Sequence, residues 1–448
     1  MSVIQDYGID NRIMSITLDN ASANSKAIDY FINSNIPNIA GKFFHARCAC
    51  HIINLIVQSG LKQVASRIDN IRTALGWIMA SNQRIAEFAR YCKSKNLMPR
   101  KFQTDMPIRW NSTYSMLKSA LPYGKEITSF YNLNTANDPR HEKLTDDDWY
   151  VANVFVEFLK VFYDATVELS GVYYPTSPLA LHKLYDMADL LKQYSENMTV
   201  ASAVSHMQKK FKKYWGEIPL LYAFGIVIDP RFRFNGLQVF SKELGDALGL
   251  SETDVAEHLS TLKSQIFEIF SIYEDRYSDG TAEPTPPQQQ SQQQSKLMRI
   301  FFNKATTSLA LGSSSQSQSQ GQRQHVELDK YLRTEYSITD TDDFTTNDLL
   351  KWWCGKRNNF PILSRLACDI LAIPVSTVSS EQVFSTAGRI LVETRCSLAP
   401  DAVEALTCLK DWENAKFKRQ HQLENNELMD DFSSMTIDES SGSNQPTS

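Results

Sequence analysis

The sequence RIMSITLDNASANSKAIDYFIN, residues 12–33, predicts a strand that is followed directly by a helix. Residues 12–18 are rich in apolar and β-branched side chains, as is typical of a short strand. Asp19 follows at the carboxyl end of this strand, and a helical pattern extends from about Ser22 to Asn33. Residues 43–50 predict a second strand, which apolar residues at helical spacing follow. The order strand, helix, strand, helix predicts an α/β fold with a parallel sheet.

The next part of the chain predicts helices. From residue 67 to about residue 240 the pattern is mainly helical, and its clearest apolar stripe consists of Val151, Val154, Phe155, Phe158, Leu159 and Phe162. Residues 278–325 are rich in Pro, Gln and Ser, and such a composition buries too little apolar surface to offset chain entropy. We therefore expect a disordered linker there, and a disordered acidic tail at residues 416–448.

Two helices are predicted between the linker and the tail. Residues 361–373 place apolar side chains at helical spacing between two prolines, and residues 400–412 carry a second apolar face. This punctuation indicates that residues 326–415 form an ordered helical region.

Composition restricts the class of protein. The chain has 448 residues, of which 42% are hydrophobic and 22% charged, enough for two or three globular domains. No apolar run approaches the roughly 20 residues that span a bilayer, so we expect no membrane partner. The seven cysteines are odd in number and widely spaced, which favours reduced thiols and a cytoplasmic or nuclear location.

Charge is distributed unevenly along the chain. Residues 1–130 hold 16 Lys or Arg against 8 Asp or Glu, whereas residues 327–415 hold 9 against 14. Such a basic region could contact nucleic-acid phosphates, although a solvated helix face is the simpler explanation. The densest basic stretch comprises Arg84, Arg90, Lys93, Lys95, Arg100 and Lys101.

Six motifs then occur in a fixed order along the chain. They are TLDNASAN (residues 17–24), RCACHIINL (47–55), IRWNSTY (108–114), VIDPR (227–231), LLKWW (349–353) and the segment from Pro374 to Leu391. In this combination and order the chain resembles the hAT superfamily of cut-and-paste transposases, including the plant Activator type and domesticated relatives with a BED zinc finger.

The resemblance implies an incomplete ribonuclease H-like fold with a large all-helical insertion and a helical carboxy-terminal dimerisation region. We accordingly assign residues 1–130 to the ribonuclease H-like part, 131–277 to the helical insertion and 326–415 to the dimerisation region. In this family three carboxylates hold two divalent cations for DNA cleavage. Asp19 matches the second of them and Glu381 the third, with Mg²⁺ as the expected ion. Each residue could instead cap a helix.

The resemblance also assigns roles to two other motifs. His51, in the pattern Cys48-x-x-His51, matches a family position near the DNA strand, and a histidine bonded to backbone is the alternative. Cys48, Cys50 and His51 look like half a zinc site, but no second ligand pair follows at suitable spacing. In Arg109, Trp110 and Asn111 the guanidinium suits a phosphate and the indole an unpaired base, with a buried core tryptophan as the alternative.

A third set of residues is predicted to mediate self-association. Apolar anchors suit an obligate interface, and they suit a helical core equally well. The set comprises Trp352, Trp353, Leu363, Leu366, Leu406 and Leu409.

The first family carboxylate belongs on a strand well upstream of Asp19, and only 18 residues precede Asp19 here. Asp6 and Asp10 are poor substitutes, and the BED finger is not found. We therefore expect a domesticated or decaying nuclear protein without transposase activity, which requires no cofactor unless some Mg²⁺-dependent capacity remains. Its partners would be DNA, bound weakly or non-specifically, and a second copy of itself.

Two alternative functions stay open. The chain could be an active transposase whose start is assigned too late. It could also be a dimerisation module that sequesters intact relatives as heterodimers.

Overall fold

The computed structural model describes residues 6, 8, 13–33, 45–100, 102–103, 105–107, 109–277, 325–334, 348–391 and 398–416. They belong to two compact units. The first unit consists of Met1–Ile56, Asp164–Ser195 and Ser205–His421, and the second of Val57–Tyr163, Glu196–Val204 and Gln422–Ser448. None of the helices in these described ranges is long and apolar enough to cross a membrane.

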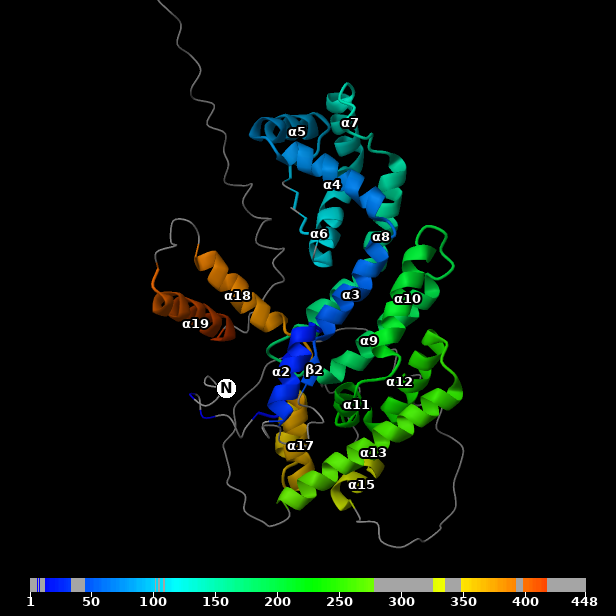
Figure 1. Cartoon of the computed structure of the whole chain (residues 1–448), viewed down its shortest axis with the longest axis vertical. Helices are drawn as coiled ribbons and strands as arrows, with labels where there is room; N and C mark the ends of the chain where they lie inside the picture. Colours follow the sequence, from blue (N-terminus) through cyan, green and yellow to red (C-terminus); the bar gives the residue numbers. More distant parts are fainter. Residues whose placement is uncertain are drawn as a thin grey trace, which may run out of the picture. The chain divides into compact units, whose positions relative to one another are not determined.

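The first unit contains the strands and most of the helices (Figure 1). Its elements are β1 (Ile16–Leu18), α2 (Ser22–Asn33), β2 (His45–Arg47), α3 (Ala49–Leu61), α9 (Ser177–Gln193), α10 (Ala201–Trp215), α11 (Leu220–Val227), α12 (Arg233–Leu248), α13 (Glu252–Tyr277), α15 (Val326–Arg333), α16 (Leu349–Gly355), α17 (Pro361–Leu371), α18 (Val378–Ile390) and α19 (Pro400–Lys416). The second unit holds α4 (Ala65–Met79), α5 (Asn82–Ser94), α6 (Trp110–Ala120), the 3-10 helix η1 (Leu121–Tyr123) and α7 (Gly124–Thr135). α3, α8 (Asp146–Leu169) and α10 contribute residues to both units.

The two strands form a parallel pair, which confirms the predicted strand, helix, strand order. Ile16 lies beside His45, and Leu18 lies beside Arg47. Ile28 of α2 is buried, and Ile16 and Leu18 of β1 pack against it. A helix that returns the chain to a parallel strand covers the sheet in this way because the strands' apolar side chains must be removed from water.

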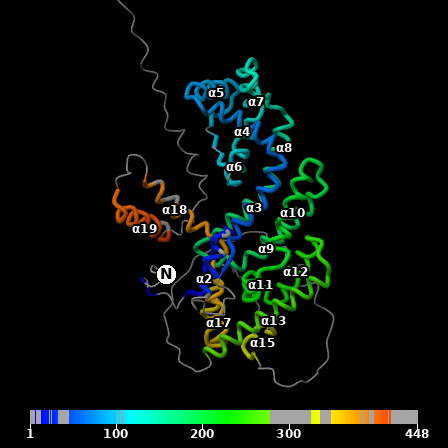
Figure 2. The backbone as a smooth tube through the Cα atoms, viewed as in Figure 1, coloured from blue at the N-terminus to red at the C-terminus, as the bar shows by residue number. Residues whose placement is uncertain are grey.

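Helices α9, α11 and α12 form the helical core of the first unit. α11 is almost entirely buried, including Phe224 and Ile226. A Cβ atom on Gly225 would lie 2.6 Å from the carbonyl carbon of Ser177, so only glycine allows α11 this close to the start of α9. The path of these helices is also visible in the backbone trace (Figure 2).

The second unit has an aromatic core. The rings of Phe88 and Phe130 lie 5.3 Å apart, and those of Trp77 and Tyr131 lie 5.7 Å apart. Asp148, in the first turn of α8, is fully buried and accepts hydrogen bonds from Asn70 Nδ2 and from the Thr145 backbone and hydroxyl groups. Its buried charge is therefore satisfied by fixed donors.

The carboxy-terminal helices dock on the end of α11. Tyr331 donates its hydroxyl proton to the carbonyl oxygen of Val227 at 3.0 Å, and the indole Nε1 of Trp353 donates to that of Ile228 at 2.9 Å. These carbonyls end a helix and have no partner within it. Two aromatic side chains from beyond residue 325 thus complete α11.

The domain boundary that we predict between residues 130 and 131 falls inside α7. The predicted linker and tail fall, apart from residues 325 and 416, outside the described residues. The helices predicted at residues 361–373 and 400–412 are confirmed as α17 and α19.

We expect Trp353→Phe to destabilise the chain. The substitution leaves the buried carbonyl of Ile228 without its donor, and an unpaired buried polar group costs about 1–3 kcal/mol. The free energy of unfolding, measured by urea titration, should fall by this amount. Trp412→Phe is the matched control, because that side chain is 66% exposed. An equal loss in both variants would show that the hydrogen bond to Ile228 contributes nothing.

Candidate functional site

Asp19 lies at the carboxyl end of β1, and its carboxylate accepts hydrogen bonds in the turn that leads to α2. Oδ1 accepts hydrogen bonds from the Ala21 backbone at 3.0 Å and from Asn24 Nδ2 at 2.6 Å. The first bond is the short-range turn that Asp forms with the backbone two residues on. Asp19 therefore caps the start of α2, as the alternative interpretation predicts. Both of these hydrogen bonds use Oδ1, and neither uses Oδ2.

The segment before α18 lies against the ends of the strands. Thr17 Oγ1 donates to the carbonyl oxygen of Pro374 at 2.6 Å, and the Ala49 backbone N–H donates to that of Val375 at 2.8 Å. The Cys48 N–H donates to the carbonyl oxygen of Leu18 at 2.8 Å. These bonds bring residues 374–377 to the carboxyl ends of the strands, where Asp19 lies.

The sulfur atom of Cys48, which follows β2 directly, contacts the first residues of α3 and the residue before α18. Sγ accepts hydrogen bonds from the His51 backbone N–H at 3.4 Å, the Thr377 backbone N–H at 3.3 Å and the Thr377 hydroxyl at 3.2 Å. Cys48 is fully buried. Its side chain thus satisfies N–H groups at the starts of α3 and α18 that lack helical partners.

Glu381 lies in the first turn of α18 and is exposed. Its Oε1 accepts a hydrogen bond from the Thr377 hydroxyl at 2.9 Å. Because that hydroxyl has one proton, it can donate to Glu381 or to Cys48, but not to both at once. The contacts through Leu18, Cys48 and Thr377 place Asp19 and Glu381 at the same edge of the sheet. The sequence did not identify Thr377, although a threonine immediately before a helix is a capping signal.

The donor set suits a divalent cation only in part. Mg²⁺ is commonly bound through one or two carboxylates together with substrate phosphate and water, and Asp19 and Glu381 are two carboxylates. Within the part of the chain that the structure describes, no three His, Cys, Asp or Glu side chains gather in an arrangement that could hold a metal ion. The roles of Asp19 and Glu381 as metal ligands therefore stay a prediction.

Among the described residues, Cys48, Cys50 and His51 do not form a group that could hold a metal ion. The Cys50 sulfur contacts Ser170 Oγ at 3.5 Å and the carbonyl oxygen of Thr166 at 3.7 Å, whereas the Cys48 sulfur contacts Thr377. Burial raises the pKa of Cys50 to about 12, with the neighbouring Cys48 as a second cause. A metal ion at Cys50 would have to displace this proton.

The motif at Arg109 lies in the second unit. Trp110 is buried, and its ring lies 6.3 Å from that of Tyr114 and 6.5 Å from that of Tyr163. The indole is therefore a core side chain in this structure, and it is not open to a base. Arg109 is exposed, and the amide oxygen of Asn111 is buried with no partner among the described residues.

The neighbouring hydroxyls of this motif organise the start of α6. Ser112 and Thr113 donate to Asp105 Oδ1 at 2.8 and 2.9 Å, and Asp105 also pairs with Arg72. The two hydroxyls and the arginine satisfy a carboxylate that is 2% exposed.

The predicted basic residues divide into two groups. Arg84 is engaged within its own unit, with its guanidinium 4.3 Å above the Trp77 ring, and Arg100 is half-buried. Arg90, Lys93 and Lys95 are exposed on and just after α5. Lys101 lies outside the described residues.

The predicted self-association residues also divide. Trp353, Leu363 and Leu366 are fully buried in the core of their own unit, so in this structure they serve the core and present no surface to a partner. Trp352 is half-buried. On α19, by contrast, Leu406 is 42% exposed and Leu409 is 57% exposed.

Comparison with known protein families identifies three regions. Residues 327–413 match the hAT family C-terminal dimerisation region, residues 46–158 the ZBED1 RNase-like helical domain, and residues 179–273 the hAT-like transposase RNase-H fold. The chain thus combines an RNase-H-fold domain, a helical domain and a carboxy-terminal dimerisation region. The matched ranges are divided differently from the predicted domains, which end at residues 130 and 277.

Several known plant proteins are similar to the chain. It is 29% identical to a putative AC transposase of Zea mays, over 93% of this chain and 50% of that protein. It is also 29% identical to the zinc finger BED domain-containing protein RICESLEEPER 2 of Oryza sativa subsp. japonica, over 91% of this chain and 57% of that protein. The chain spans about half the length of these curated relatives. Together with the motif order, these matches show that the chain carries hAT-family domains and is homologous to plant AC transposase and BED zinc-finger RICESLEEPER proteins.

Proposed function

We propose that this chain acts by association and not by catalysis, as a domesticated hAT protein that binds DNA weakly and pairs with a second copy in the nucleus. Some relatives are named as transposases and others as BED zinc-finger proteins. Both names favour a protein that acts on DNA. The observation that supports the proposal is that the chain has two exposed surfaces, a basic one in the second unit and an apolar one on α19.

The basic surface belongs to the second unit. Between residues 62 and 125 the sequence holds 12 Lys or Arg and 3 Asp or Glu. Two of the three acids, Asp69 and Asp105, pair with Arg72. Several basic residues in this range are exposed, and they comprise Lys62, Arg90, Lys93, Lys95, Arg109, Lys118 and Lys125. A surface of this sign attracts phosphates without reading base sequence.

The apolar surface belongs to α19. Ala405, Leu406, Leu409 and Trp412 are exposed, and their spacing places them on one side of the helix. On α18, which packs against α19, Phe384 is 77% exposed. Adjacent apolar side chains of this size mark an interface in a soluble protein. The family match to a dimerisation region covers α19 as far as residue 413, which favours a second copy of this chain as the partner.

The absence of cleavage activity is part of the proposal. Asp19 accepts a side-chain hydrogen bond from Asn24, Glu381 accepts one from Thr377, and the described residues add no third carboxylate to them. Two carboxylates hold the pair of cations used in phosphodiester cleavage less completely than three do.

A cleavage assay tests this part directly. The full chain is incubated with end-labelled duplex DNA and Mg²⁺ or Mn²⁺, beside Glu381→Gln. We expect no cleavage above background from either protein. Robust cleavage that Glu381→Gln abolishes would contradict the proposal and favour an active transposase.

The DNA surface predicts a charge-specific weakening of binding. Arg90→Gln/Lys93→Gln/Lys95→Gln should weaken binding to unrelated duplexes equally and lower the salt dependence, by about 1 in log K against log salt for each phosphate that the protein no longer neutralises. Fluorescence anisotropy at several salt concentrations measures both. Arg140→Gln/Lys143→Gln/Lys160→Gln removes the same charges elsewhere in the unit and is the control. If the two variants weaken binding equally, the effect comes from net charge, and the α5 residues do not form a specific DNA-binding surface.

The α19 surface predicts the oligomeric state. Leu406→Ser/Leu409→Ser/Trp412→Ser should convert a dimer into a monomer in sedimentation velocity, because the apolar area that drives pairing is removed. Met98→Ser/Leu133→Ser/Met198→Ser alters three similarly exposed apolar residues elsewhere, and it should leave the dimer intact. A wild-type chain that sediments as a monomer at micromolar concentration, or a dimer that survives in the α19 variant, would refute this interface.

A further inference from the structure

Helix α10 carries a second basic surface, which lies outside the basic stretch of the second unit. Its apolar residues Val204, Met207, Phe211 and Trp215 recur at steps of three and four residues, and all four are buried. This stripe fixes which side of α10 faces the core. The exposed residues of α10 lie on the side away from this stripe.

The solvent-facing surface is occupied by lysines. Lys209, Lys212 and Lys213 are exposed and Lys210 is half-buried. From residue 197 to residue 216 the sequence contains these four lysines and no Asp or Glu. Among the described residues, none of the four forms an ion pair, and Lys213 Nζ lies 5.5 Å from its neighbouring Tyr214 ring. No direct ion pair within the described residues therefore neutralises these charges.

A favourable interaction with the helix dipole explains only part of this pattern. Lys212 and Lys213 lie in the last turn, where cations stabilise a helix end. Lys209 lies a turn earlier, and with Lys213 it forms a like-charge pair at a spacing that destabilises a helix. An anion bound outside the helix would relieve that repulsion.

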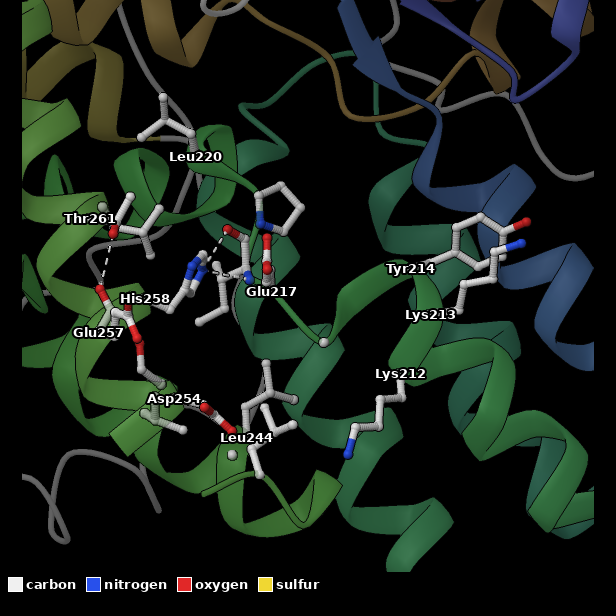
Figure 3. A pocket seen from close by; sticks show the side chains of 18 of the residues that line it. Lys212, Lys213, Tyr214, Glu217, Leu220, Leu244, Asp254, Glu257, His258 and Thr261 are labelled. Atoms are coloured by element: carbon white, nitrogen blue, oxygen red, sulfur yellow. Dashed lines mark hydrogen bonds between the residues drawn. The ribbon is translucent and has the colours of Figure 1, made fainter. Parts of the chain in front are cut away.

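Lys212 and Lys213 line a cavity together with acidic residues. A cavity of about 990 Å³ beside the end of α10 is lined by Lys212 and Lys213, and also by Glu217, Asp254 and Glu257. Figure 3 shows the two lysines on the α10 side of this cavity, with Glu257 and His258 across from them. The carboxylates make the cavity itself unsuitable for an anion, so a ligand for the lysines would lie along the outer surface of the helix.

The spacing of the lysines suits a phosphate backbone. With a rise of about 1.5 Å per residue, Lys209 and Lys213 are separated by about 6 Å along the helix axis. One DNA strand carries a charge about every 3.4 Å of its own axis, so the surface could span about two neighbouring phosphates. Lysine is a compact point charge that suits phosphate contacts without base readout. An acidic protein would usually be met by a mixed polar and apolar surface, which this helix face lacks.

We propose that the exposed lysine face of α10, formed by Lys209, Lys212 and Lys213, is a sequence-independent binding surface for nucleic-acid phosphates. The inference rests on the proposed association with DNA, and it adds a contact surface in the other unit of the chain. It requires no catalytic activity and no bound metal.

Titration of the full chain with labelled duplex and single-stranded DNA at about 50 to 200 mM salt tests the inference. Lys209→Gln/Lys212→Gln/Lys213→Gln should weaken binding to unrelated duplexes equally and lower the slope of log K against log salt by about 2. Lys209→Arg/Lys212→Arg/Lys213→Arg keeps the charge and should restore both. Lys242→Gln/Lys263→Gln/Lys351→Gln removes the same charge from exposed positions elsewhere in the first unit, and it should change neither.

The possible outcomes separate this inference from the proposed function. An unchanged slope in the α10 variant, or an equal effect in the control, overturns the inference. If the α5 variant then binds DNA more weakly while the α10 variant does not, the proposed DNA association stands and only the α10 surface fails. If the α10 variant keeps its DNA affinity but no longer binds polyglutamate, the surface serves an acidic protein and the inference also fails. A full chain that binds no DNA overturns both.

Discussion

Residues 374–377 hold together three segments that are far apart in the sequence, and the architecture of the first unit depends on these hydrogen bonds. Pro374 and Val375 accept hydrogen bonds from Thr17 and Ala49, and the Val375 N–H donates to Thr176 Oγ1 at 3.2 Å. Val375 is fully buried. Since a buried backbone group without a partner is costly, this segment can be accommodated only where all of these partners are present.

The position of Glu381 follows from this constraint. Thr377, at the end of the segment, is fixed by the Cys48 sulfur, and α18 begins at the next residue. The helix therefore starts beside the carboxyl end of β1, where Asp19 lies. The link between the end of β1 and the start of α18 is thus made by a thiol, a hydroxyl and backbone groups, all of which can persist whether or not the carboxylates bind metal. The arrangement therefore does not depend on metal binding.

The surfaces of the chain differ in what they can bind. The second unit and α10 each expose lysines that no described acidic group neutralises, whereas α19 exposes apolar side chains. Charged and apolar surfaces attract different partners, because phosphates replace counterions at one and apolar area leaves water at the other. The separation of these surfaces along the chain is consistent with simultaneous binding of DNA and a second copy.

The sequence by itself determined the parallel strands, the positions of α2, α17 and α19, and the order of the family motifs. These features depend on local periodicity and on proline or capping residues, which act over a few positions. Only the tertiary structure decided that Trp110, Trp353, Leu363 and Leu366 are core residues and that Leu409 and Trp412 are exposed. An apolar side chain gives the same local signal whether it faces its own core or a partner, and the difference depends on which distant helix covers it. For the same reason the sequence could not reveal Thr377 as the link between Cys48 and Glu381, because that link joins residues more than 300 positions apart.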